Sequence, residues 1–354
     1  MTATAVAAVT GGGVLAAARE PRNQAGVAAA PLSATPRALP QTTVALDARK
    51  LTAGRAPQLT YLRGRTIYSD PGNPVKVSAT DEVGATARLW DLTLTVLVRS
   101  ATSSSLVIQD DQGKLIKQVP KVDSLTVGID GQYAAYASGG QYARGAVGGT
   151  VYYQPPTLRQ VEELHRPKDY NLKVLAVVGH KVYFQSAPAA DKPSSLYRWD
   201  VDHHTVTPVS KVIAPLSLTA DGALAAGTPV FTDSGLCSVV TTVSTGLQKW
   251  RTCQYRLDHF SPSNAYVVGW APGAGEPYGE NRVSLLDAKT GKLLRAWTAP
   301  SIRGAVAEDD DHVLLLWNDS QNPQSRSAVV RCTVSTGQCE LATPLSSEPL
   351  LLGS

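Results

Sequence analysis

Carboxylate and imidazole side chains, which bind metals and transfer protons, gather at a few places along the 354-residue chain. The run Asp309-Asp310-Asp311-His312 has the composition of a metal cluster, but it separates two apolar runs, where acidic residues are common turn formers. The pair His203-His204 occupies a similar polar turn. The segment 162–165 (EELH) lacks the His-Glu-x-x-His order of zinc peptidases and indicates an outer strand with polar ends. We therefore expect no metal and no cofactor.

Motifs for nucleophilic or phosphate chemistry are missing from the sequence. No Gly-x-Ser-x-Gly elbow is present to position a serine nucleophile. The glycine-rich stretch 139–149 precedes an apolar strand pattern rather than a helix, and it lacks the lysine of a phosphate-binding loop. We assign no catalytic residue and expect a protein that is not an enzyme.

The four cysteines form two symmetric pairs around turns. Reflection through Thr245 maps Cys237 onto Cys253, and reflection about the next Ser-Thr-Gly turn maps Cys332 onto Cys339. Residues directly opposite on antiparallel strands are close enough for a disulfide. A Cys₄ zinc site is disfavoured because the short Cys-x-x-Cys spacings are absent. We predict two disulfides, each joining the two outer strands of one sheet, and hence an oxidising compartment.

The elements that carry these residues are repeated strand–turn–strand units. One unit turns at Asp-Gly, as in 124–138 and 216–227, and a second turns at Thr-Gly. The glycines of the second unit, Gly246, Gly291 and Gly337, recur at intervals of 45 and 46 residues. A period of about 40–50 residues that holds four strands is typical of a β-propeller. Trp250 and Trp297 follow two of these turns, and we expect them to pack between neighbouring blades.

The units predict an all-β fold: a single seven-bladed β-propeller of four-stranded antiparallel blades. The first blade lacks one strand. The C-terminal run 349–352 could supply it and close the ring by pairing the N- and C-terminal strands, and 44–46 is the competing segment. The predicted blades span 57–79, 85–120, 122–165, 169–211, 213–254, 256–299 and 301–343.

Several segments carry a family resemblance. SPSNAYVVG (261–269) is similar to the Ser-Pro-Asp-Gly turn of WD-repeat-like and TolB-like propellers. Together with EDDDHVLLLW (308–317) and VVRCTVSTGQCELAT (329–343), it resembles the extracytoplasmic propellers of membrane-anchored actinobacterial proteins of unknown function. The resemblance is best over 213–345. It implies an extracytoplasmic, membrane-anchored propeller and no catalytic residues.

The N-terminal segment supports export. Residues 2–18 carry no charge and end in three alanines, so we expect 1–18 to be a membrane anchor or, alternatively, a cleaved signal of a secreted protein. Residues 19–56 are expected to be an Ala/Pro-rich linker, and 57–354 the propeller. Only 18% of the residues are charged and the net charge is +4, scattered along the chain, which excludes a nucleic-acid footprint.

Long loops concentrate on one face of the predicted propeller, between the second and third strand of each blade (139–149, 186–194, 271–281 and 318–327). Because ring closure does not need this length, we expect the loops to bind a protein or cell-envelope ligand on a monomeric domain that senses or recognises it. The candidate contact residues are Tyr142, Arg144, Glu276, Tyr278, Glu280, Arg282, Asp319, Gln321, Asn322 and Arg326.

Two alternatives stay open at this point. The first is an enzyme, a hydrolase or lyase, whose site lies in the central funnel. Asp258 and His259 are the one adjacent acidic–basic pair expected on an inner strand there. The second alternative is a passive structural scaffold with no ligand of its own.

Overall fold

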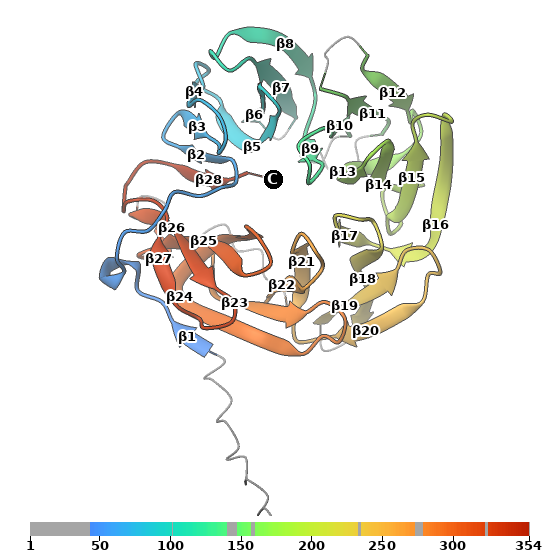
Figure 1. Ribbon diagram of the computed structural model, residues 1–354. Coiled ribbons are helices and arrows are strands. Elements are labelled where there is room, and N and C mark those ends of the chain that lie inside the picture. Colours follow the sequence, from blue (N-terminus) through green and yellow to red (C-terminus); the bar gives the residue numbers. More distant parts are fainter. Residues whose placement is uncertain are drawn as a thin grey trace, which may run out of the picture. The chain divides into compact units, whose positions relative to one another are not determined.

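The computed structural model describes residues 43–353, apart from 101, 140–146, 157–159, 233–234, 273–278 and 323–324. Within these residues the fold is all-β, with one short 3₁₀ helix, η1 (Ala48–Lys50). The strands form several four-stranded antiparallel sheets that follow one another along the chain, which makes a propeller-like β fold (Figure 1). No helix among the described residues is long and apolar enough to cross a membrane, and the expected anchor at 1–18 lies outside them.

Five sheets contain four strands each. The first is assembled from both ends of the described chain, because β28 pairs with β2. In sheet order the strands are β28 (Leu350–Leu352), β2 (Tyr61–Arg63), β3 (Thr66–Tyr68) and β4 (Val75–Lys76); β5 (Glu82–Leu89), β6 (Leu92–Ser100), β7 (Ser103–Gln109) and β8 (Leu115–Pro120); β9 (Ser124–Val127), β10 (Ala134–Ser138), β11 (Thr150–Gln154) and β12 (Glu162–His165); β13 (Tyr170–Val178), β14 (Lys181–Ala187), β15 (Ser195–Asp200) and β16 (Thr205–Ile213); β17 (Pro215–Leu218), β18 (Leu224–Thr232), β19 (Gly235–Thr242) and β20 (Gln248–Thr252).

The remaining strands share one continuous sheet. Its order is β21 (Arg256–Phe260), β22 (Tyr266–Trp270), β23 (Glu280–Asp287), β24 (Leu293–Ala307), β25 (His312–Asn318), β26 (Ser327–Thr333) and β27 (Cys339–Leu341). The first half of β24 pairs with β23 and the second half with β25, so one strand crosses the boundary that the repeats place at 299–301.

Apolar side chains fill the spaces between successive sheets. Leu94 and Ile108 of one sheet pack with Tyr136 of the next, and Ala137 packs in the same way against Phe184 of the sheet after that. The first strands of successive sheets also touch, from β5 and β9 through β13 and β17 to β21. Sheets buried on both faces explain why few charged residues are needed.

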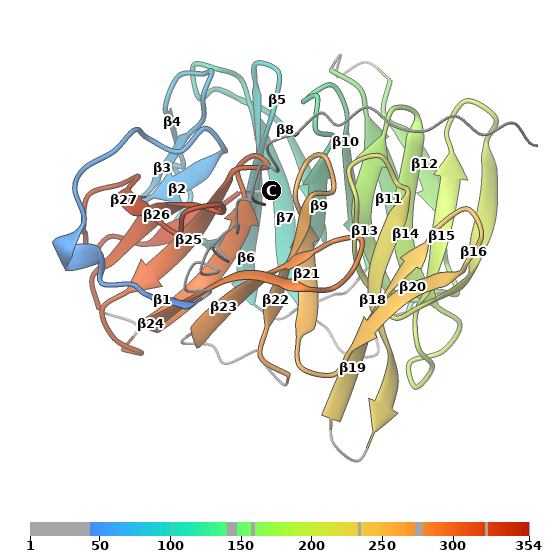
Figure 2. The same ribbon diagram turned by 60° about the horizontal axis from the view of Figure 1, so that its bottom comes forward.

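One hairpin is longer than the sequence pattern indicates. Strands β18 and β19 remain paired as far as Thr232 and Gly235, beyond the apolar runs that end at 227 and begin at 237. Figure 2 shows this hairpin projecting past the ends of the neighbouring strands. A register shift between Gly227 and Val230 marks where the projecting part begins.

The two predicted disulfides are confirmed. Cys237 is bonded to Cys253 and Cys332 to Cys339, with Cα–Cα separations of 4.0 and 4.1 Å. The Cys332–Cys339 bond joins the outer strands β26 and β27. The Cys237–Cys253 bond joins β19 to the residue directly after the outer strand β20. Among the described residues no cysteine is free. The disulfides indicate an oxidising, extracytoplasmic location.

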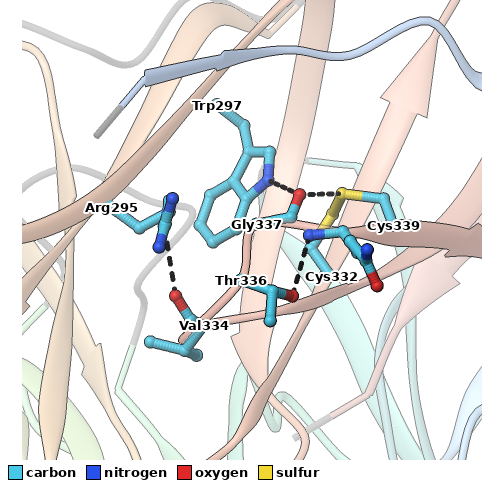
Figure 3. The surroundings of a disulfide bond; sticks show 8 residues. Arg295, Trp297, Cys332, Val334, Thr336, Gly337 and Cys339 are labelled. Carbon is cyan, nitrogen blue, oxygen red and sulfur yellow. Dashed lines mark hydrogen bonds between the residues drawn. A yellow bond between two sulfur atoms is a disulfide. The ribbon is translucent and has the colours of Figure 1, made fainter. Parts of the chain in front are cut away.

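The outer turns receive aromatic side chains from the preceding strands. The Trp250 indole donates to the Ala288 carbonyl at 2.9 Å, and the Trp297 indole donates to the Gly337 carbonyl at 3.4 Å. A side chain at Gly291 would collide with the Trp250 ring, so the glycine is needed for this contact. Figure 3 shows Trp297 beside the Cys332–Cys339 hairpin. The Trp250 contact joins two successive sheets, as expected, and the Trp297 contact joins two parts of the continuous sheet.

Residues 43–58, most of which the sequence places in the linker, run across two outer strands; we call them the N-terminal strap. Strand β1 (Thr43–Ala45) pairs in parallel with β24, and Ala53 bridges to Leu341 of β27. Leu46 and Ala48 are buried in the hydrophobic core of the last sheets.

A buried ion pair fixes the end of the strap. The side chains of Arg331 and Glu308 are 3% and 0% exposed, and the Arg331 guanidinium donates to Glu308 at 2.5 and 2.7 Å. Its remaining protons go to Glu340, at 2.9 Å, and to the carbonyls of Arg55 and Ala56, at 2.7 and 2.8 Å. All five guanidinium donors are therefore satisfied. Burial alone would lower the pKa of Arg331, but the bonds from Glu308 and Glu340 outweigh it and raise the pKa.

Replacing Arg331 with methionine is expected to lower the free energy of unfolding by about 3–5 kcal/mol, because among the described residues the buried Glu308 charge then keeps only the half-exposed Arg55 guanidinium, 3.9 Å away, as its cation. Urea denaturation followed by circular dichroism measures this loss. The double variant Arg331→Met/Glu308→Leu should recover part of the stability, since no charge is then stranded. A single variant within about 1 kcal/mol of the parent, the range of exposed ion pairs, would contradict this role.

Candidate functional site

The structure describes six of the ten predicted contact residues; Tyr142, Arg144, Glu276 and Tyr278 lie outside the described residues. The six described residues form two groups, one at the start of β23 and one in the loop after β25, and β24 lies between them. On one side Glu280 pairs with Ile302 and Arg282 pairs with Thr298. On the other side Asn318, which precedes Asp319, pairs with Ser301. The starts of β23 and of the 319–326 loop therefore border the same stretch of β24. The six residues brought to this edge are Glu280, Arg282, Asp319, Gln321, Asn322 and Arg326.

The 319–326 loop has a fixed base and an exposed tip. The Asp319 amide donates to the Arg326 carbonyl at 3.0 Å, and the Arg326 guanidinium reaches the Asp319 carboxylate at 3.3 Å. Ser327 exchanges two backbone hydrogen bonds with Ser346, which ties the loop to the C-terminal segment. Gln321 and Asn322 are exposed at the described part of the tip. A fixed base with polar side chains in solvent suits recognition of a polar ligand.

The N-terminal strap adds charged residues that sequence reasoning missed. The Asp47 carboxylate accepts from the Arg49 guanidinium at 2.8 and 3.1 Å and lies 3.7 Å from the Lys50 ammonium. The bond from Arg49 lowers the pKa of Asp47, and Asp47 together with the more distant Asp319 raises the pKa of Arg49. Arg49 is thus within electrostatic reach of the loop. The only sequence signal was an Asp two residues before a basic pair, a helix-capping pattern inside an expected linker.

We use the term loop-edge surface for 280–282, 319–322, 325–326 and 47–50. Nearby concavities lie where the strap crosses the last hairpin. One pocket of about 500 Å³ has a polar lining that includes Arg55, His312 and Gln338. A second, of about 520 Å³, is lined on one side by Val44, Asp47 and Leu51 of the strap.

The acidic cluster 309–312 is a hydrogen-bonded turn. Asp309 accepts from the amides of Asp311 and His312 at 2.8 and 2.7 Å and from the His312 ring at 2.9 Å. Asp310 accepts from the backbone amide of Ser263, in the β21–β22 turn of the same sheet, at 3.0 Å. These carboxylates thus stabilise the turn and its neighbour.

Two other histidines that the sequence singled out, His203 and His165, form hydrogen bonds to nearby residues. The His203 ring bonds to Asp200 at 2.8 Å within its turn, and the His165 ring bonds to Thr150 on the adjacent strand at 3.1 Å. Those two histidines and their partners therefore serve their own turn and strand. Within the described residues, no group of three or more His, Cys, Asp and Glu side chains is arranged to hold a metal ion.

The glycine-rich stretch has a packing role at its described ends. A side chain at Gly139 would meet the Leu172 carbonyl at 2.2 Å, and one at Gly149 would meet the Ser138 carbonyl at 1.8 Å. Both positions need glycine because the backbones approach so closely. Residues 140–146 lie outside the described residues.

The pair Asp258 and His259 lies on β21, the first strand of its sheet. The His259 ring is 3.5 Å from the Asp258 carboxylate, whose other oxygen accepts from the Trp270 indole at 3.2 Å. The two side chains are 31% and 50% exposed. They could exchange a proton with a bound molecule, but no third polar group orients the imidazole in the manner of a catalytic triad among the described contacts.

At the edge of the sheets opposite the loop-edge surface, side-chain hydrogen bonds join turns to neighbouring turns. Tyr133 bonds to the His180 ring of the next sheet at 3.1 Å, and the Asn264 amide donates to Asp221 of the preceding sheet at 3.0 Å. The Tyr266 hydroxyl donates to the carbonyls of Asp309 and His312, both at 2.9 Å. This edge is cross-linked by side chains, whereas the loop-edge surface leaves its tips in solvent.

Comparisons with known proteins identify the fold alone. No family model and no curated protein matches the sequence. A structure from a study of two prolyl endopeptidases is 14% identical with a TM-score of 0.52; the match covers 86% of this chain and 50% of that one, so the chain spans about half of that protein. A functionally unknown protein from Desulfotomaculum acetoxidans is 10% identical with a TM-score of 0.52, covering 84% of this chain and 99% of that one. TolB from Acinetobacter baumannii is 18% identical with a TM-score of 0.43, over 68% and 65% of the chains.

The carboxylate of Asp221 should make stability pH-dependent. Burial alone would raise its pKa, but bonds from Thr219, the Ala223 amide and Asn264 outweigh this and lower it. The contribution is complete above the unfolded pKa of about 3.9 and is lost as pH falls through the lower folded pKa. In Asp221→Asn, Oδ1 can still accept from Thr219 and Ala223, but the charge is gone and the oxygen that accepts from Asn264 is replaced by an NH2 group, a loss that does not vary with pH.

We therefore expect Asp221→Asn to be less stable than the parent at pH 7 and to approach it near pH 3. Urea denaturation at both pH values measures the difference, with Asp130→Asn in an equivalent turn as the control. A deficit that stays constant with pH would contradict the role of the charge.

Proposed function

We propose that the protein is a non-catalytic recognition or sensing domain that binds a protein or cell-envelope ligand outside the cytoplasm. The observation that carries this proposal is the loop-edge surface, where Arg282, Gln321 and Arg326 are exposed on either side of one rigid strand. Charged and amide side chains on a fixed base bind polar surfaces with little loss of conformational entropy. The two disulfides support a place outside the cytoplasm.

We further propose that the sheets form a seven-bladed ring closed by the chain ends. Five four-stranded sheets and two blades that share β24 would make seven. The pairing of Tyr61–Arg63 with Leu350–Leu352 supports closure, as do the contacts of β28 with β24, β25 and β26. In this arrangement the domain acts as a monomer and is tethered through the N-terminal segment, with a secreted form as the alternative.

A photo-crosslinking amino acid at Gln321 tests the binding surface. We expect a discrete crosslinked species when the domain is mixed with the envelope fraction of the cells that produce it, and loss of that species in Arg282→Ala/Arg326→Ala. The matched control carries the crosslinker at Gln248, an exposed residue of the outer strand β20.

The outcomes of this experiment separate the hypotheses. Equal crosslinking from Gln321 and Gln248, unaffected by the arginine changes, would contradict recognition by the loop-edge surface. A scaffold that uses its outer strands would give species from Gln248 instead.

The second candidate function is an enzyme with its site at Asp258 and His259, favoured by their 3.5 Å contact and partial exposure on β21. To test this candidate, the purified domain is assayed for hydrolysis or elimination of envelope-derived peptides and saccharides. If such turnover is found, Asp258→Asn and His259→Gln should each lower it at least tenfold. Turnover that survives both changes would place the activity elsewhere.

A further inference from the structure

Trp90 occupies a position that folding does not favour. It is the first residue of the two-residue turn between β5 and β6, where Leu89 pairs with Leu92. Its φ of 53° lies in the left-handed region, which asparagine and glycine adopt readily and bulky residues avoid. The side chain is 58% exposed, whereas the other five tryptophans are buried or half-buried. The indole therefore contributes little to the hydrophobic core, although its residue adopts an unfavourable backbone conformation.

The turn that presents Trp90 is well fixed. The Arg88 guanidinium donates to the Trp90 carbonyl at 2.6 Å and to the Thr93 hydroxyl at 2.9 Å. The indole is thus held in solvent by its own hairpin, so binding would need little ordering of the backbone.

Other apolar side chains are exposed on the same side of the neighbouring strands. Ile129 is 65% exposed in the turn after β9, whose strand contacts β5. Leu115 is 56% exposed at the start of β8, directly after another turn of the Trp90 sheet. Four of the eight large apolar side chains exposed among the described residues lie on these two sheets at or next to such turns. They are Trp90, Leu115, Ile116 and Ile129, which we call the Trp90 surface.

The turns of the Trp90 surface carry mainly negative charges, and Lys117 follows Ile116 on β8. Asp91 follows Trp90, Asp130 follows Ile129, and Asp111 lies in the turn before Leu115. Burial lowers the pKa of Arg88, and Asp91 and Asp111 act in the opposite direction, which places both carboxylates within electrostatic reach of the turn. Arg88 is engaged by the turn itself, and Lys114 is the one other cation in these turns.

We propose that the Trp90 surface binds a basic polypeptide segment that also carries apolar residues. An exposed indole attracts arginine and lysine over its ring face, and flanking carboxylates add charge complementarity. Ile129 and Leu115 supply contacts for the apolar residues of such a segment. A neutral saccharide could stack on the indole but would gain nothing from the excess of negative charge. This surface is separate from the loop-edge surface and does not depend on it.

A peptide of alternating leucine and arginine, with blocked ends, is the probe, and its match has glutamate in place of arginine. We expect the arginine peptide to bind saturably, to shift the Trp90 fluorescence to shorter wavelength and to weaken as salt rises. The glutamate peptide should not bind. Equal binding of both peptides, or a fluorescence shift with chitin oligosaccharides and not with the arginine peptide, would overturn the proposal.

The decisive variant is Trp90→Asn. Because asparagine suits the left-handed turn, we expect a raised melting temperature together with at least tenfold weaker peptide binding, measured by calorimetry since the reporting indole is removed while the other five tryptophans remain. Asp91→Asn/Asp130→Asn should weaken binding and leave the melting temperature nearly unchanged. Leu247→Asn, at a distant exposed apolar residue, is the control and should bind normally.

Unchanged binding in Trp90→Asn, or a lowered melting temperature, would show that the indole has a structural role instead. Arg282→Ala/Arg326→Ala should keep full affinity for the peptide, so failure here is distinguishable from failure of the loop-edge surface.

Discussion

The buried pairing of Arg331 with Glu308 is the interaction on which the end of the fold depends. A guanidinium that is 3% exposed is tolerated only because all five of its donors have acceptors, two of them carbonyls of the N-terminal strap. The same Glu308 carboxylate also accepts from the Gln58 amide at 2.7 Å. Strap and sheet therefore satisfy each other's buried polar groups, and neither is complete alone.

Contacts between successive sheets also fix the positions of the strands relative to one another. The Trp250 and Trp297 indoles reach the outer turns of the following strands. Asn264 bonds to a turn of the preceding sheet, and Tyr266 bonds to the β24–β25 turn further along its own sheet. Strand β24 pairs with β23 along its first part and with β25 along its second, so these two parts of the continuous sheet cannot shift relative to each other without breaking backbone hydrogen bonds. Such a frame can carry side chains of the loop-edge surface at fixed positions while their tips stay in solvent.

The sequence could predict what depends on local repetition. Turn glycines at a regular period indicated the sheets, and symmetry about Thr245 was enough to pair Cys237 with Cys253, because opposite positions in a hairpin follow from strand register alone. The strap was not predictable in this way. Its three-residue strand β1 has no hairpin partner, and it pairs with β24, about 250 positions away.

The candidate site was predictable only in part for the same reason. Loop length and composition pointed to 319–326, but the electrostatic influence of Asp319 on Arg49 depends on how the strap crosses the sheets. Turn chemistry also competes with catalytic patterns: Asp309 and His312 bond to each other in their turn, so composition alone could not distinguish a turn from a metal site.

The pairing of β28 with β2 sets an order for folding during synthesis. The first sheet holds only three strands until Leu350–Leu352 leave the ribosome, so the edge of Tyr61–Arg63 stays unpaired while the intervening residues, more than 280 of them, are made. Contacts between residues so distant in sequence form slowly, and an open strand edge invites pairing with other chains in the meantime. The synthesis of the three leucines of β28 therefore sets the earliest moment at which this strand edge can be covered.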